Sequence, residues 1–139
     1  MLKSCFSGVY NFRRIVQNEN ISMKGTATFI SIDNEKYRYH EVGHYVQHET
    51  PKSFFQTRFF IIENTSFVIQ KIDGSALHEF QIPQDSSFPL VLRHAHYCKN
   101  DVYDITLTFL SEHEFKTSYK IKGPQKNEEI HTHYMQENK

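Results

Sequence analysis

The sequence predicts an all-β fold, an antiparallel up-and-down β-barrel of about ten strands. Three observations lead to this prediction. Turn-forming residues recur about every 8–12 residues, apolar and polar side chains alternate between the turns, and 14% of the residues are aromatic. A chain of 139 residues can bury one core but not two, so we expect a single barrel domain over residues 1–139.

Nine turn signals divide the chain into ten segments. They are Asn18-Glu19-Asn20, Asp33-Asn34-Glu35, Glu49-Thr50-Pro51, Glu63-Asn64-Thr65, Asp73-Gly74, Pro83-Gln84-Asp85, Lys99-Asn100-Asp101, Ser111-Glu112 and Gly123-Pro124. All four prolines lie in or beside these turns, where the missing backbone N–H does not interrupt a ladder of hydrogen bonds.

The segments between the turns have the period of two that is typical of half-buried strands. It is clear in residues 23–29, 102–110 and 115–122, where apolar side chains share one face and polar side chains the other. Residues 67–72 and 76–82 flank Asp73-Gly74, a good hairpin signal. Ten short strands joined by tight turns rarely form a flat open sheet, so we expect the sheet to close.

The charge balance excludes several kinds of partner. Lys and Arg total 16 and Asp and Glu total 16, which argues against a basic surface for nucleic acid or anionic membrane.

No apolar stretch approaches the roughly 20 residues of a membrane-spanning helix, and no signal-peptide pattern is visible at the start. The two cysteines, Cys5 and Cys98, are far apart in sequence, so we expect a reducing, cytoplasmic location. The sequence does not indicate an oligomeric state.

Residues 40–44 read His40-Glu41-Val42-Gly43-His44, the H-E-x-x-H pattern of zinc proteases. On a helix the two histidines would bind one zinc ion and Glu41 would activate its water. However, tyrosine and valine residues around the motif favour a strand, and Gly43 is unfavourable inside a helix. A zinc-dependent hydrolase is therefore retained as an alternative, and a strand is the preferred interpretation.

Nine histidines are the unusual feature of the composition. His94, His96 and Cys98 alternate along one segment, as do His131 and His133, a pattern that can bind a metal but is also common on a barrel surface. One barrel histidine could also hold heme, although no motif indicates it. Because acidic and basic residues balance, we expect ligand affinity or self-association to change between about pH 7 and 5.5.

Arg58 is the other unusual residue, because it lies in the phenylalanine-rich segment 54–62 and shares a face with Phe60 and Ile62. A charged side chain in such a strand is either exposed at an edge or paired inside the barrel. In the interior, Arg58 would suit a carboxylate ligand.

Several short pieces together resemble a known family. They are Gly8-x-Tyr10 with Phe12 and Arg14, Gly25-x-Ala27-x-Phe29, Tyr39-x-Glu41-x-Gly43, Arg58-x-Phe60, Asp73-Gly74 with Leu77-His78, His96-x-Cys98-x-x-Asp101-x-Tyr103, Gly123-Pro124-x-Lys126 and Thr132-x-Tyr134. Nearly end to end, the chain is similar to domain of unknown function 6314, a family of small, mainly bacterial proteins. The resemblance implies a lipocalin-like (calycin-like) barrel. Tyr10 and Tyr119 stand where the pattern has tryptophan, and the last strand lacks the closing arginine.

Barrel pattern and resemblance together predict a lipocalin-like protein that binds a small anionic or carbonyl-bearing ligand in its interior. The candidate ligand-binding residues are Arg14, Glu41, Arg58, His78, His96, Tyr103 and Tyr134. The sequence favours binding over catalysis and indicates no catalytic residue, metal ligand, cofactor, nucleic-acid partner or membrane partner. The alternatives are the zinc-dependent hydrolase through His40, Glu41 and His44, and a structural or interaction protein with a filled barrel.

Overall fold

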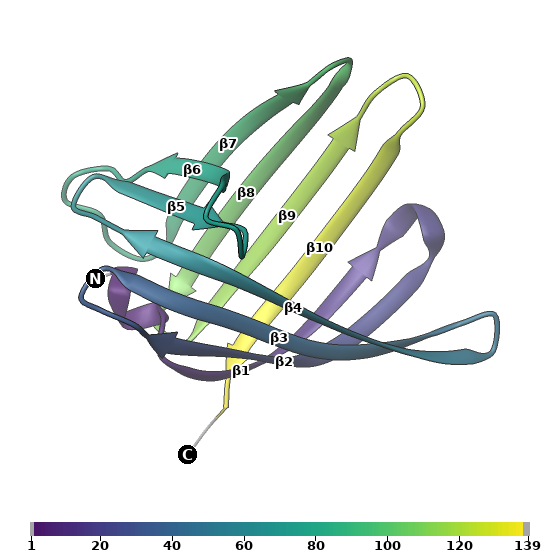
Figure 1. The fold of residues 1–139 in the computed structure, drawn as a ribbon, viewed down its shortest axis with the longest axis horizontal. Coiled ribbons are helices and arrows are strands. Elements are labelled where there is room, and N and C mark those ends of the chain that lie inside the picture. The colour runs from purple at the N-terminus through teal and green to yellow at the C-terminus, as the bar shows by residue number, and fades with distance from the viewer. Residues whose placement is uncertain (1, 138–139) are drawn as a thin grey trace.

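The computed structural model describes residues 2–137, and ten antiparallel strands form one sheet in this part of the chain (Figure 1). The strands are β1 (Gly8–Val16), β2 (Ile21–Ser31), β3 (Lys36–Gln47), β4 (Thr50–Ile62), β5 (Ser66–Gln70), β6 (Ala76–Gln81), β7 (Leu90–Cys98), β8 (Asp101–Ser111), β9 (Glu114–Lys122) and β10 (Asn127–Gln136). Each of the nine predicted turns overlaps a connection between two consecutive strands, although Thr50, Pro51, Asp101 and Ser111 belong to the strand ends. The predicted all-β antiparallel fold is confirmed.

The strand order explains why the sheet is a nearly closed barrel. Consecutive strands pair from β1 to β6 and from β7 to β10, and β10 pairs with β1 in the register Phe12 opposite Tyr134. The sheet therefore has its two edges at β6 and β7, which are consecutive in the chain but have no hydrogen-bonded ladder between them. Figure 1 shows the sheet curled so that these edges approach each other.

Aromatic side chains fill one end of the barrel. A short 3-10 helix (Leu2–Cys5) leads into Phe6, whose ring lies 5.1–5.9 Å from those of Phe29, Phe60, Phe67 and Phe109, measured between centroids. The Tyr10 hydroxyl is buried there, 2.6 Å from the carbonyl oxygen of Cys5 and 3.0 Å from that of Glu112. At the other end the β3–β4 hairpin diverges from the β7–β8 and β9–β10 hairpins (Figure 1).

A close approach of β2 and β3 gives a direct test of the fold. Gly25 lies opposite Gly43, and a Cβ atom on Gly25 would overlap the Val42 carbonyl oxygen and lie 2.6 Å from the Gly43 Cα. Backbone cannot move aside as a flexible side chain can, so we expect Gly25→Ala to lower the free energy of unfolding by about 1–3 kcal/mol. Urea denaturation measures this change. The neighbouring exposed change Thr26→Val is the control and should change stability by less than about 0.5 kcal/mol; equal effects of the two changes would contradict the prediction.

Candidate functional site

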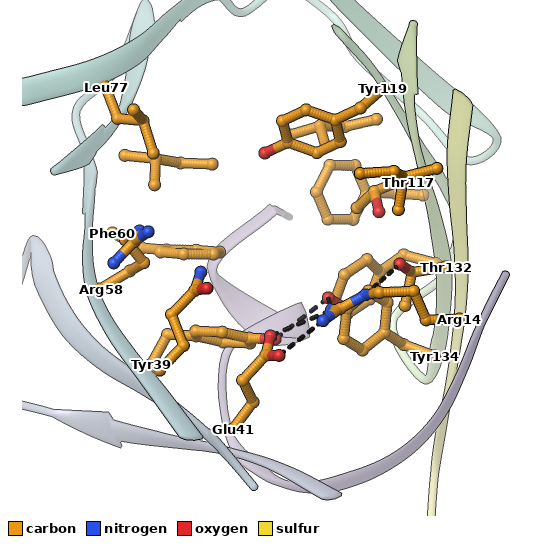
Figure 2. Close-up of a pocket in the computed structure, with 16 residues that line it drawn as sticks. Arg14, Tyr39, Glu41, Arg58, Phe60, Leu77, Thr117, Tyr119, Thr132 and Tyr134 are labelled. Atoms are coloured by element: carbon orange, nitrogen blue, oxygen red, sulfur yellow. Dashed lines mark hydrogen bonds and ion pairs between the residues drawn. The ribbon is translucent and has the colours of Figure 1, made fainter. Parts of the chain in front are cut away.

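The barrel interior contains a cavity of about 290 Å³ (Figure 2). Aromatic, aliphatic and polar side chains line it: Tyr39, Phe60, Phe109, Phe115, Tyr119 and Tyr134; Ile69, Leu77, Leu107 and Ile130; and Arg14, Glu41, Gln56, Arg58, Thr117 and Thr132. Most of these residues alternate along β3, β4, β8, β9 and β10, so the strand period of two turns them inward. The interior is therefore not completely filled by its own side chains.

On one side of the cavity, Arg14 and Glu41 form a largely buried ion pair. Arg14 Nη1 donates to Glu41 Oε2 at 2.6 Å and Nη2 donates to Oε1 at 3.0 Å, so the contact is bidentate (Figure 2). The Arg14 side chain is 16% exposed and that of Glu41 only 2%. Such parallel hydrogen bonds are among the stronger polar contacts in proteins and fix the orientation of both groups.

Three hydroxyl groups complete the hydrogen bonds around this pair. Arg14 Nε donates to Thr132 Oγ1 at 2.8 Å and Nη2 donates to the Tyr134 hydroxyl oxygen at 3.2 Å. The Tyr39 hydroxyl donates to Glu41 Oε1 and lies 3.0 Å from the Tyr134 hydroxyl. Because the single proton of Tyr39 is used on Glu41, Tyr134 is the donor between the two tyrosines.

Burial keeps both tyrosines protonated. Burial is the largest cause that raises the pKa of Tyr39, followed by electrostatic interaction with Tyr134 and with the carboxylate of Glu41. Burial also raises the pKa of Tyr134, against the effect of Arg14. Burial alone would lower the pKa of Arg14, but the hydrogen bond to Glu41 and nearby charges raise it overall. The ion pair and its hydroxyl partners are here called the Arg14–Glu41 network. Its polar groups form their hydrogen bonds with one another.

Arg58 pairs with Tyr39 in the β3–β4 register, lies across the cavity from Arg14, and has different surroundings (Figure 2). Its Nη1 donates to the carbonyl oxygen of the adjacent Thr57 at 3.0 Å, while its Nε is buried without a hydrogen-bond partner. Among the described residues that line the cavity, Glu41 has the only carboxylate, and Arg14 binds it. Arg58 therefore brings an uncompensated positive charge to the cavity wall.

Three histidines approach one another where the edge strands β6 and β7 meet, and Arg58 is close enough to one of them, His78, to affect its pKa. The ring centroids of His78 on β6 and His94 on β7 are 6.2 Å apart, and those of His94 and His96 are 6.4 Å apart. His78 is only 5% exposed, and neither of its ring nitrogens has a hydrogen-bond partner. Burial, followed by the charges of His94, His96 and Arg58, lowers the pKa of His78 to about 4. His78 is therefore a neutral imidazole at neutral pH.

The structure places the predicted site residues in two groups. Arg14, Glu41, Arg58 and Tyr134 line the cavity, and the His78 ring lies 5.4 Å from that of the lining residue Tyr119. His96 and Tyr103 lie opposite each other on β7 and β8, with their ring centroids 5.9 Å apart. They are not part of the cavity lining.

Sequence reasoning missed Tyr39, Thr132 and Tyr119 as cavity residues. Residues two apart on a strand face the same side. Glu41 and Tyr134 would therefore have predicted that Tyr39 and Thr132 also face the interior.

The H-E-x-x-H motif lies in strand β3, so the preferred interpretation of this motif is confirmed. His40 contacts Thr57 Oγ1 at 2.7 Å on the outer face and His44 is exposed, whereas Glu41 points inward to Arg14. Residues four apart on a strand are separated by about 13 Å, too far for both histidines to bind one zinc ion. Within residues 2–137, no group of three His, Cys, Asp or Glu side chains has an arrangement that could hold a metal ion.

The fold and the cavity define an antiparallel, nearly closed β-barrel with a polar network in its interior. The chain belongs to the family of unknown function DUF6314, whose model matches residues 6–136, so the family resemblance seen in the sequence is confirmed. A search of curated proteins finds no match. No helix within residues 2–137 has the length and apolar character needed to cross a membrane.

Solved structures with a similar fold include designed barrels. The barrel EF1p2_mFAP2b, bound to DFHBI, has a TM-score of 0.57 and 8% identity over 98% of this chain and 97% of that chain. A de novo designed fluorescence-activating β-barrel has a TM-score of 0.53 and 11% identity over 99% of each chain. The redesigned barrel mFAP1, bound to DFHBI, has a TM-score of 0.53 and 7% identity over 97% of this chain and 98% of that chain. At these identities the similarity shows the barrel fold alone.

Proposed function

We propose that this protein binds a small anionic or carbonyl-bearing molecule inside the barrel, with Arg58 contacting its charged or carbonyl oxygen. The observation that carries the proposal is the unpaired guanidinium group of Arg58 on the cavity wall, with a buried Nε that has no partner. Arg58 is half-buried, its Nε has no acceptor and no carboxylate pairs with it, so a ligand oxygen would supply both the acceptor and the opposite charge.

The size and lining of the cavity suggest the rest of the ligand. A volume of about 290 Å³ is near the lower end for small-molecule sites. It is roughly twice the cavity of about 150 Å³ that accommodates benzene in an engineered protein core. The rings of Tyr39, Phe60 and Tyr119 would cover an apolar or aromatic group. An acid or ketone with a single ring and a short side chain fits these dimensions.

The Arg14–Glu41 network has a supporting role in this proposal. Its hydrogen bonds are already made, so it offers a ligand fewer free groups than Arg58 does, and it fixes the opposite wall of the cavity. A fixed wall lowers the entropy lost on binding. EF1p2_mFAP2b is bound to DFHBI, and its similar fold supports a barrel that holds a small molecule.

We also propose a cytoplasmic location, as the sequence predicts. The support is that Cys5 and Cys98 are both free thiols, one buried and one exposed. Structural disulfides are rare in the reducing cytoplasm, so unpaired cysteines suit that compartment.

Binding of matched probes tests the role of Arg58. We expect 3-phenylpropionate and the ketone 4-phenyl-2-butanone to bind more tightly than 3-phenylpropanol, measured by isothermal titration calorimetry. Arg58→Gln should reduce the affinity for 3-phenylpropionate at least tenfold, because a hydrogen bond to a charged group contributes about 1.5–3 kcal/mol. The control is Arg93→Gln on the exposed outer face of β7, which should leave affinity unchanged. Equal affinity of the wild type for the acid and the alcohol would refute the proposal.

A further inference from the structure

The unsatisfied polar atoms of this barrel gather in one place. Within residues 2–137, the buried side-chain nitrogens without a hydrogen-bond partner are Arg58 Nε, both ring nitrogens of His78 and Nδ1 of His94. These residues come from β4, β6 and β7, which are separated in sequence. Since buried polar groups in folded proteins are nearly always paired, a concentration of unpaired donors and acceptors calls for a missing partner.

The surroundings of His78 are positive or neutral. Arg58 faces it from β4, His94 and His96 from β7, and the neutral Tyr119 hydroxyl group belongs to the adjoining wall on β9. The charges that lower the pKa of His78 are those of His94, His96 and Arg58, and no carboxylate is among its causes. An anion beside these groups would reverse this effect and favour protonated imidazole.

The histidines lie on the two edges of the sheet, which are not held together by backbone hydrogen bonds. His78 lies on one edge of the sheet and His94 and His96 lie on the other, with no ladder of hydrogen bonds between the two strands. Small shifts of β6 relative to β7 therefore do not break backbone pairing.

We propose that Arg58, His78 and His94 form a subsite for a doubly charged acid group, that of a phosphate monoester, and that binding transfers one proton from solvent to the histidines. The inference rests on the proposed function because Arg58 belongs to both. One arginine compensates one negative charge, and a dianion leaves a second charge that a protonated imidazole compensates. Three phosphate oxygens supply acceptors for the N–H groups of Arg58 and the histidines.

Phenyl phosphate and phenyl sulfate provide the test, because they have nearly the same shape and differ by one charge. At pH 7.5 the phosphate is mainly a dianion, since its second pKa is near 6, and the sulfate is a monoanion. We expect phenyl phosphate to bind at least tenfold more tightly, with uptake of about one proton. Calorimetry in two buffers of different ionisation enthalpy measures that uptake. The buffer acid supplies the proton that is taken up, and no covalent bond of the ligand changes.

Two variants and a control assign the proton to the histidines. His78→Gln and, separately, His94→Gln should each reduce the preference for the phosphate and the proton uptake, while binding of phenyl sulfate persists. His94 is partly exposed, so its replacement tests the idea even if His78→Gln does not fold. His44→Gln, on the exposed outer face of β3, should leave both quantities unchanged.

The outcomes separate this inference from the proposed function. Equal affinities for the two probes without proton uptake would overturn the subsite and leave Arg58 as a site for singly charged groups. A phosphate preference that survives both histidine replacements would also overturn it. If neither probe binds and 3-phenylpropionate does not bind either, the proposed function fails together with the subsite.

Discussion

Replacing Glu41 with glutamine is expected to lower the free energy of unfolding by about 3–5 kcal/mol, because it leaves the Arg14 guanidinium buried without its counter-charge. Arg14→Met should cost a similar amount, since the carboxylate of Glu41 would then be buried and unpaired. Urea denaturation at pH 7 measures both changes. The double variant Arg14→Met with Glu41→Gln should be considerably more stable than the sum of the two losses predicts, because neither charge remains.

An exposed ion pair is the control for this cycle. Lys120 Nζ and Glu129 Oε1 are 4.0 Å apart, with the Lys120 side chain 53% exposed, and such surface pairs contribute at most about 1 kcal/mol. Lys120→Gln, which removes this pair and leaves the contact between Glu129 and His131, should therefore have a small effect. Additive losses at Arg14 and Glu41 would show that the two charges are not coupled. A loss below about 1 kcal/mol for either replacement would show that removing the partner does not leave a costly unpaired charge.

The strands could be predicted because their signals are local. Turn residues and the alternation of side chains depend on neighbouring positions, so the nine connections between strands fall at the predicted turns. The inward direction of Arg58 also follows from a local pattern, because it is two residues from the buried Phe60.

The contacts inside the barrel could not be predicted in the same way. Arg14 and Glu41 are 27 residues apart, and their pairing depends on how β1, β2 and β3 align. The sequence placed both among the ligand-binding candidates but gave no reason for them to bind each other. His78 and His94 meet across the one junction between consecutive strands that lacks a ladder, so no register rule brings them together. Their proximity is a consequence of how the sheet closes.

Lowering the pH from 6.5 to 4 is expected to destabilise the barrel through His78. Its pKa in the folded protein is about 4, below its ordinary value of 6.5, because burial and then the charges of His94, His96 and Arg58 disfavour the imidazolium. Below pH 6.5 the unfolded chain takes up this proton before the folded chain does, so stability falls with pH across this window. The loss from His78 approaches about 3 kcal/mol near pH 4, at about 1.4 kcal/mol for each pKa unit.

Comparison of the wild type with His78→Phe isolates this effect from the other groups that titrate. Phenylalanine has a similar ring, and His78 already lies against the rings of Phe80 and Tyr119, so the variant should fold. The difference in free energy of unfolding between the two proteins, measured with urea at several pH values, should grow in favour of the variant as the pH falls from 6.5 to 4. His44 is exposed, so the free energy of unfolding of His44→Gln should depend on pH as that of the wild type does. A constant difference across this range would mean that His78 takes up its proton equally in the folded and unfolded states, and that burial beside Arg58 does not hold it neutral.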